Sequence, residues 1–161
     1  MTDAGGGSAA ASGAIGRIVA DAHLMPVRVY WEDTDAGAIV YYANYLKFTE
    51  RARSDMLRLL GIDQRAMMER ESGAMFAVRD VQASYLAPAR LDDDLVVETR
   101  LIELKGATLS LSQDVVRQGD RLVRTQVRAA FIGLDGRPRR IPPLVRERLT
   151  ALTTRGGEEE Q

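Results

Sequence analysis

The spacing of hydrophobic positions predicts one long helix in the first half of the chain. From Tyr45 to Leu60, apolar side chains recur every three or four residues, which is the period of an amphipathic helix. We expect this helix to begin between Tyr42 and Tyr45. Gly61 follows the last apolar position, where a left-handed helix cap belongs. A shorter helix is expected over residues 64–71.

Beyond these helices the period changes to two, which is the period of strands. The breaks between the alternating segments are short enough for hairpins, so most of the sheet should be antiparallel. One long apolar helix against about five strands predicts an α+β fold, with a curved antiparallel sheet wrapped around the helix. One edge of such a sheet stays open to a second copy of the chain. The strands are expected over residues 27–31, 75–86, 95–104, 108–115 and 122–131.

The two ends of the chain differ in composition from this central region. Residues 1–24 are rich in Ala, Gly and Ser, so we expect a flexible N-terminal extension. The folded domain is expected over residues 25–152, followed by an acidic C-terminal tail over residues 153–161. The chain of 161 residues is long enough for one domain with a buried core.

The content of reactive and charged residues excludes several classes of protein. Without cysteine, the chain can form neither disulfides nor a thiolate metal site nor a cysteine nucleophile. Its one histidine, His23, lies in the expected extension, which argues against a Ser-His-Asp triad and against a metal site. The net charge of -1 provides no overall attraction to nucleic acid. No apolar run approaches the roughly 20 residues of a membrane span, and we expect a cytoplasmic protein.

Three acids crowd the turn before the long helix: Glu32, Asp33 and Asp35. They could simply place negative charge near the helix N-terminus. Alternatively, one carboxylate acts on a substrate carbonyl that is held by the N–H groups of the helix, and Gly37 lets the backbone approach the ligand closely. Thioester hydrolysis needs only one carboxylate, because a thiol with a pKa of about 8.5 leaves as thiolate without a strong general acid.

The same region carries a family resemblance. Residues 27–46 (VRVYWEDTDAGAIVYYANYL) and 48–53 (FTERAR) resemble the signature of the hotdog-fold thioesterases. They are most similar to the branch that contains 4-hydroxybenzoyl-CoA thioesterase and the Tol–Pal-associated acyl-CoA thioesterases. Residues 85–93 (YLAPARLDD) form a second matching block, typical of the Tol–Pal-associated group. The resemblance covers about residues 25–145.

The resemblance implies an acyl-CoA thioesterase that forms dimers through sheet edges, and often tetramers, with active sites at the dimer interfaces. It implies Asp35 as the catalytic nucleophile or general base and the N–H at or near Tyr42 as the oxyanion donor. Most Tol–Pal-associated members have His in place of Tyr42, whereas the 4-hydroxybenzoyl branch has Tyr there. No cofactor is implied, because CoA is part of the substrate. Further substrate contacts are implied at Gly37, Val40, Tyr45, Lys105, Gly106 and Thr108.

Several alternatives stay open. Glu50 is a second candidate for the catalytic carboxylate, or it forms an intrahelical ion pair with Arg53. Lys105 and the arginines of residues 137–140 either bind the phosphates of CoA or are solvated loop charges. The substrate is expected to be an acyl-CoA or aryl-CoA, with acyl-carrier protein as another possible partner. Two other functions remain: a noncatalytic subunit that binds acyl-CoA or acyl-carrier protein, and a hotdog dehydratase or hydratase.

Overall fold

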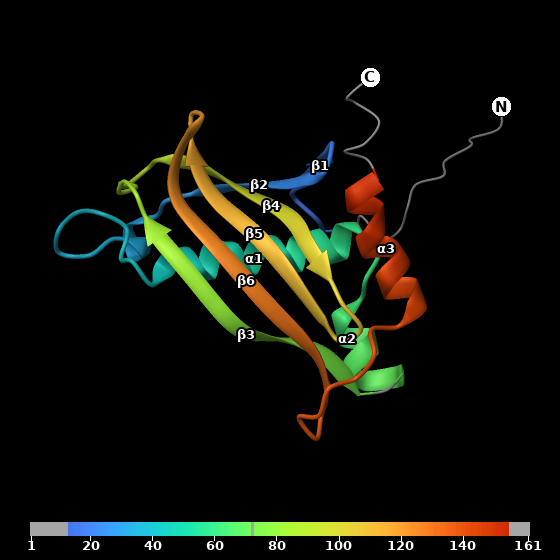
Figure 1. Ribbon diagram of the computed structural model, residues 1–161. Helices are drawn as coiled ribbons and strands as arrows, with labels where there is room; N and C mark the ends of the chain where they lie inside the picture. The colour runs from blue at the N-terminus through green and yellow to red at the C-terminus, as the bar shows by residue number, and fades with distance from the viewer. Residues whose placement is uncertain (1–12, 72, 155–161) are drawn as a thin grey trace.

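The computed structural model describes residues 13–71 and 73–154, which form a curved sheet wrapped around one long helix (Figure 1). All strand pairs are antiparallel, and the strand order across the sheet is β1-β2-β4-β5-β6-β3. The predicted α+β fold is confirmed, with six strands in place of about five. The strands are β1 (Arg17–Val19), β2 (Ala22–Arg28), β3 (Ala74–Tyr85), β4 (Asp94–Leu104), β5 (Thr108–Arg117) and β6 (Asp120–Gly133). The helical segments are η2 (Trp31–Asp33), α1 (Asn44–Leu59), α2 (Gln64–Ala66), η3 (Met67–Glu71) and α3 (Pro143–Thr154).

The central helix α1 follows from the apolar stripe in its sequence. Tyr45, Phe48, Ala52 and Met56 lie on one face at helical spacing and are buried against the sheet. The helix ends as predicted at Gly61, whose φ is 78°. The N–H of Gly61 donates to the carbonyl of Arg58, and the N–H of Ile62 donates to that of Leu57, a pairing that caps the last turn.

The sheet has one long open edge. Strand β3 pairs only with β6, so its other side has no strand neighbour among the described residues. Val78, Val81 and Tyr85 on this strand are all more than 40% exposed. A long edge strand with exposed apolar side chains is a surface suited to pairing with another strand.

The prediction of a flexible segment over residues 1–24 is wrong for its last part. Strand β1 and the first half of β2 lie inside that range and extend the sheet, since β1 pairs with β2 and β2 pairs with β4. The expected strand at 27–31 is therefore the end of β2, and a 3-10 turn begins at Trp31. Residues 1–12 lie outside the described residues, as do residues 155–161 of the expected tail. At the other end, α3 runs through Thr153, where the tail was expected to begin.

A buried hydrogen bond between His23 and Asp55 explains why the N-terminal segment joins the fold. His23 is fully buried, and its Nε2 lies 2.8 Å from Oδ2 of Asp55 on α1. The same carboxylate accepts the N–H groups of Ile15 and Gly16, each at 2.8 Å. A Cβ on Gly16 would lie 2.5 Å from both Asp55 Oδ2 and His23 Nε2, so only glycine fits there. Asp55 therefore fastens the segment before β1 to the central helix.

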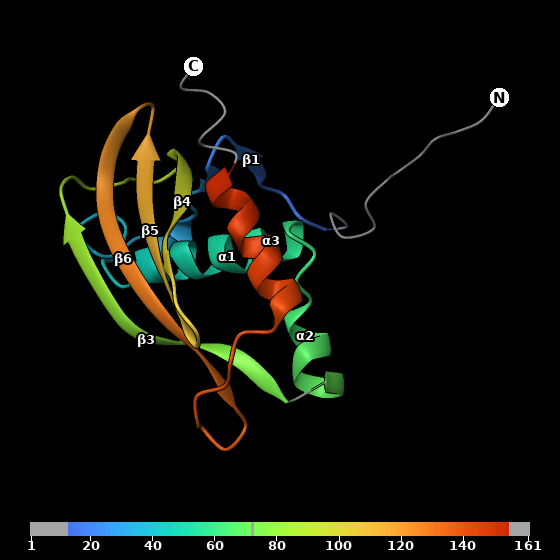
Figure 2. The same cartoon turned by 45° about the vertical axis from the view of Figure 1, so that its right-hand side comes forward.

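The C-terminal helix α3 covers the end of α1 that is remote from the turn at residues 34–40 (Figure 2). Leu149 and Leu152 of α3 are buried and share a core cluster with Met56 and Leu57 of α1. A second cluster around Phe48 fills the other end of the sheet. The two ends of α1 thus lie in different surroundings.

Candidate active site

Asp35 lies in a tight, exposed turn that joins η2 to α1, here called the Asp35 turn (residues 34–40). The backbone N–H of Asp35 donates to the carbonyl of Ile39, and Ala38 N–H donates to the carbonyl of Asp35, both at 2.9 Å. Oδ1 of Asp35 accepts the N–H of Gly37 at 2.8 Å. Among the described residues Oδ2 makes no hydrogen bond, so the turn holds the carboxylate in one orientation with one oxygen available.

Two residues of this turn have backbone conformations that shape it. A Cβ on Gly37 would lie only 3.1 Å from Asp35 Oδ1, so glycine allows the carboxylate to approach its N–H. Ala38 has a φ of 62°, in the left-handed region that residues other than glycine rarely adopt. Such strain costs about 1–3 kcal/mol and is found most often at functional sites.

The three neighbouring acids have different roles. Asp33 is buried, and its carboxylate accepts the N–H of Tyr30 at 2.8 Å. Its carbonyl accepts both the Tyr41 N–H and the side-chain amide of Asn44, so Asp33 braces the turn against the helix. Glu32 and Asp35 are exposed. Of these, only the Asp35 carboxylate is fixed by the backbone of the turn.

The N-terminus of α1 lies next to this turn and is uncapped. Ala43 at the N-cap position offers no side-chain acceptor, and the first turn contains no acidic residue. Within the described part of the chain, the N–H of Tyr42 has no hydrogen-bond acceptor, whereas its carbonyl accepts the Tyr85 hydroxyl at 3.1 Å. Free N–H groups and the helix dipole give this end partial positive charge, which suits an oxyanion.

Two of the predicted substrate contacts, Val40 and Tyr45, lie together with the predicted oxyanion donor Tyr42 beside the turn. Val40, Tyr42 and Tyr45 line a cavity of about 280 Å³ together with Tyr85 and residues 86–88. Tyr45 is buried, and its hydroxyl accepts the N–H of Ala89 at 3.0 Å. Burial raises the pKa of Tyr45, so the phenol is neutral at physiological pH. Its edge lines the cavity while its hydroxyl supports the fold.

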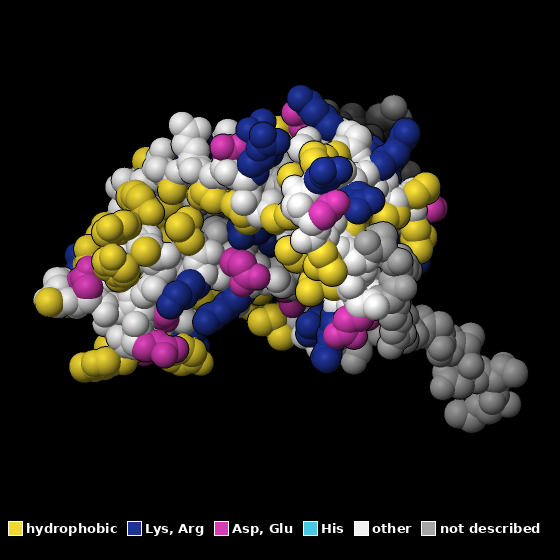
Figure 3. All heavy atoms as spheres, turned by 90° about the horizontal axis from the view of Figure 1, so that it is seen from below, with side chains coloured by type: hydrophobic (Ala, Val, Ile, Leu, Met, Phe, Trp, Pro, Cys, Tyr) yellow, Lys and Arg dark blue, Asp and Glu magenta, His cyan; other side chains and the backbone are white. Residues whose placement is uncertain are grey.

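Exposed aromatic and aliphatic side chains surround the same end of the molecule. Figure 3, a view from below Figure 1, shows hydrophobic side chains gathered toward the end that carries the Asp35 turn. Trp31 is 79% exposed. The exposed residues near the turn include Tyr30, Trp31, Tyr41, Tyr42, Tyr85 and Leu86. Patches of this kind mark interaction surfaces.

Lys105, Gly106 and Thr108 lie at the opposite end of the folded chain. They form the turn between β4 and β5, whereas the Asp35 turn is the blue-green loop at the left of Figure 1. Ile141 N–H donates to the carbonyl of Gly106 at 2.9 Å, which brings the arginines of residues 137–140 to the same end. Lys105 is exposed, and its Nζ lies 3.6 Å from Glu103. Since α1 has 16 residues and spans about 24 Å, one subunit does not bring Lys105 to its own Asp35.

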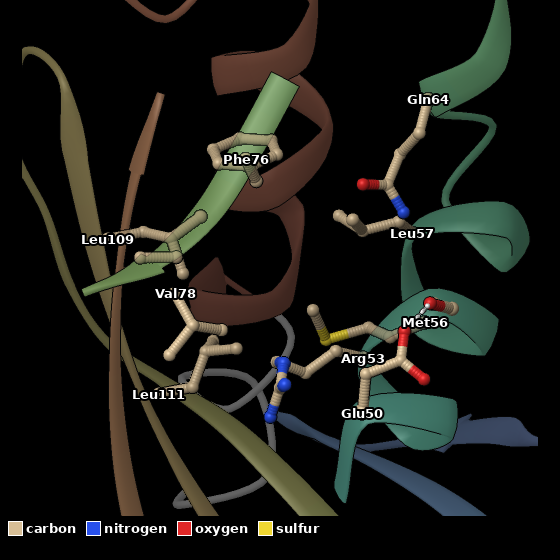
Figure 4. Close-up of a pocket in the computed structure, with 11 residues that line it drawn as sticks. Glu50, Arg53, Met56, Leu57, Gln64, Phe76, Val78, Leu109 and Leu111 are labelled. Atoms are coloured by element: carbon tan, nitrogen blue, oxygen red, sulfur yellow. Dashed lines mark hydrogen bonds between the residues drawn. The ribbon is translucent and has the colours of Figure 1, made fainter. Parts of the chain in front are cut away.

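Glu50 lines a second cavity, between α1 and strands β3, β5 and β6 (Figure 4). Its carboxylate accepts the hydroxyl of Ser54 at 3.0 Å and forms no ion pair with Arg53, so that expected pair is not formed. Arg53 lines the same cavity and instead donates to Gln113. The sequence did not single out Arg53 as a candidate. Its position beside Thr49 and Ala52, which are buried, indicates that its side chain starts near the buried face of the helix.

The acidic run at residues 92–94 is occupied by ion pairs. Asp93 accepts from Arg117 Nη1 at 2.7 Å, and Asp94 accepts from Arg28 Nε at 3.0 Å. Within residues 13–71 and 73–154, His, Asp and Glu form no group of three or more that could hold a metal ion. No helix in the described ranges is long and apolar enough to cross a membrane.

Known proteins are similar to this chain in both sequence and fold. Residues 29–149 match the family model of the thioesterase-like superfamily. Acyl-CoA thioesterase YbgC of Haemophilus influenzae is 45% identical over 110 residues, which cover 68% of this chain and 80% of that protein. The 1,4-dihydroxy-2-naphthoyl-CoA hydrolase of Thermosynechococcus vestitus is 31% identical over 112 residues, 69% of this chain and 76% of that protein. The solved structure of a probable thioesterase from Bartonella henselae is 36% identical with a TM-score of 0.72, and the match covers 75% of this chain and 99% of that one. The chain therefore belongs to the thioesterase-like superfamily of hotdog-fold proteins.

Proposed function

We propose that this protein is an acyl-CoA thioesterase, which hydrolyses a thioester to a free carboxylic acid and CoA. The names of its relatives support this class of reaction. The observation that carries the proposal is the Asp35 carboxylate, which is held by Gly37 N–H with Oδ2 free beside the uncapped N-terminus of α1. Thioester hydrolysis requires these two elements, an activating carboxylate and an oxyanion donor.

In the proposed mechanism the thioester carbonyl oxygen accepts the N–H of Tyr42. The Asp35 carboxylate either attacks the carbonyl carbon or takes a proton from the attacking water. In both cases the negative charge that develops on the carbonyl oxygen faces the positive end of α1. The C–S bond then breaks, and CoA leaves as thiolate. If Asp35 has attacked the carbonyl, water then hydrolyses the resulting anhydride, which releases the carboxylic acid and restores the Asp35 carboxylate.

A dimer through strand β3 would bring together the two halves of the predicted site. Strand β3 begins beside the turn that follows β6, at Ala74, and ends at Tyr85 beside the Asp35 turn. If two β3 strands pair antiparallel about a two-fold axis, the start of one lies beside the end of the other. The partner's Lys105 end, with its arginines, would then lie nearest to Asp35. We therefore propose a homodimer, or a homotetramer made of two such dimers, in which the partner's Lys105, Gly106 and Thr108 bind CoA.

The principal alternative is a noncatalytic subunit that binds acyl-CoA or acyl-carrier protein. A carboxylate beside the bound carbonyl gives such a subunit little benefit, whereas it gives an enzyme its base or nucleophile. A dehydratase that pairs His with a carboxylate is disfavoured, because the one histidine, His23, is buried against Asp55.

The deciding experiment follows thiol release with a chromogenic disulfide reagent, which exchanges with the CoA thiol, on a panel of alkyl-CoA and aryl-CoA thioesters. A thioesterase releases stoichiometric thiol with repeated turnover on at least one member of the panel. Binding of acyl-CoA without turnover on any of them would instead identify the noncatalytic subunit.

A further inference from the structure

The cavity that Glu50 and Arg53 line is almost entirely apolar apart from its helix side. It has a volume of about 230 Å³, enough for several methylene groups. Figure 4 shows Phe76, Val78, Leu109 and Leu111 on the strand side, facing Leu57 and Met56 of α1. The guanidinium of Arg53 points from α1 toward Leu111, across the cavity.

A buried polar network holds this guanidinium in place. Nη1 of Arg53 donates to Oε1 of Gln113 at 2.8 Å. The Nε2 of Gln113 donates to the carbonyl of Thr49 and to the hydroxyl of Thr99, both at 2.9 Å. Gln113, Thr49 and Thr99 are all fully buried. A polar network of this kind in a core orients the group it contacts, since every member is satisfied.

The charge of Arg53 is left without a counterion. Among the described residues no carboxylate lies within ion-pair distance of it, and the nearby Glu50 bonds to Ser54 instead. Burial lowers the pKa of Arg53, and the Glu50 charge opposes this shift, but an arginine stays charged at neutral pH. Of its five N–H donors, only those on Nη1 meet an acceptor in the described structure. Arg53 is half-buried, and a partly desolvated charge with free donors is stabilised when an anion binds them.

We propose that Arg53 is a specificity residue that binds a carboxylate at the far end of the acyl group. The preferred substrates are then monothioesters of dicarboxylic acids, whose methylenes occupy the apolar part of the cavity. This inference rests on the proposed thioesterase function and adds a class of substrate to it. Guanidinium and carboxylate form two parallel hydrogen bonds, which gives the selection its geometry.

The test compares chain-matched thioesters that differ only in the terminal group. Suberyl-CoA is compared with octanoyl-CoA, and adipyl-CoA with hexanoyl-CoA, on the wild type, Arg53→Leu and Arg53→Lys. We expect Arg53→Leu to lower kcat/KM for the carboxylated thioesters about 10- to 100-fold, the range for a hydrogen bond to a charged group. Turnover of the alkyl thioesters should stay equal or rise, and Arg53→Lys should retain part of the preference. Arg51→Leu, which removes an exposed charge two residues away on α1, should leave the preference unchanged.

A second readout does not depend on turnover. Free suberate should raise the melting temperature of the wild type and of Arg51→Leu, but not that of Arg53→Leu. Equal activity of the wild type on both members of each pair, with no effect of Arg53→Leu, would overturn the inference and leave the thioesterase function intact. An equal loss on all thioesters, with a lower melting temperature or a dissociated dimer, would show a purely structural role for Arg53. If no thioester turns over at all, the proposed function itself fails, and stabilisation by suberate alone then decides whether Arg53 binds carboxylates.

Discussion

Replacing Asp55 by alanine should destabilise the whole fold, because one carboxylate serves three buried or half-buried groups. The variant leaves the N–H groups of Ile15 and Gly16 without their acceptor and His23 Nε2 without its partner. His23 Nδ1 already has no hydrogen-bond partner in its buried position. Each donor left without its acceptor away from water costs about 1–3 kcal/mol, so these three, of which two are part-buried, should cost about 3–5 kcal/mol together. That is a large part of the roughly 5–15 kcal/mol that stabilises a typical domain.

For a domain of this size, 1 kcal/mol corresponds to about 3 °C, so the melting temperature should fall by about 9–15 °C. Differential scanning calorimetry of Asp55→Ala measures it. The control Glu69→Ala removes an exposed pair with Arg65 and should cost less than about 1 kcal/mol. Gly16→Ala should also destabilise the wild type, and by less in the Asp55→Ala background, since one of the atoms that its Cβ would meet is then absent. A fall of less than about 3 °C for Asp55→Ala would refute the view that this pair fastens the N-terminal segment to α1.

Three further predictions concern acid stability, assembly and CoA binding. Burial lowers the pKa of His23 below its ordinary value of 6.5, so the unfolded chain takes up a proton on His23 more readily than the folded chain does. The stability that neutral His23 contributes is therefore complete above pH 6.5 and is lost as the pH falls below that value. Between pH ~7.5 and ~5.5 the melting temperature of the wild type should therefore fall more than that of His23→Gln, and equal slopes would exclude His23 as the titrating group. Val81→Lys on the open edge of β3 should convert the proposed dimer to monomers in sedimentation and abolish turnover. The control Ile102→Lys, at an exposed residue of the inner strand β4, should do neither. An active Val81→Lys monomer would contradict the interfacial site. Lys105→Ala should raise the KM for acyl-CoA about two- to fivefold at low salt, and by less at high salt. The control Lys47→Ala, at the other lysine of the chain, should leave the KM unchanged. An unchanged KM for Lys105→Ala would mean that Lys105 is only a solvated charge.

Local patterns in the sequence were enough to predict most of the fold. The alternation over residues 108–115 and 122–131 and the cap at Gly61 depend on neighbours within a few residues, and the structure confirms them. Strand β1 and the start of β2 were missed because His23 reads as a polar residue in a small-residue segment. Its burial depends on Asp55, 32 residues away, which no local pattern reveals.

The candidate site divides in the same way. Most hydrogen bonds of the Asp35 turn join residues within 33–44, so its motif could be recognised from the sequence. Its pairing with residues 89–90 could not. Lys105 was assigned to the same site, but a single sequence does not show that it lies at the far end of α1. Arg53 entered the sequence analysis only as a possible intrahelical ion-pair partner of Glu50. Its actual partner Gln113 is 60 residues away on β5, which no local pattern reveals.

The Asp35→Asn variant tests the central claim most directly. Asparagine keeps the size of the side chain and an oxygen that can accept the Gly37 N–H, but it can neither attack a carbonyl nor take a proton from water. We expect kcat to fall at least about a thousandfold. The free energy of unfolding should stay within about 1 kcal/mol of the wild type, and the variant should still bind acyl-CoA. Glu32→Gln, the matched change at an exposed acid of the same segment, should keep full activity. A folded Asp35→Asn protein with wild-type turnover would contradict the account and transfer the catalytic role to Glu50.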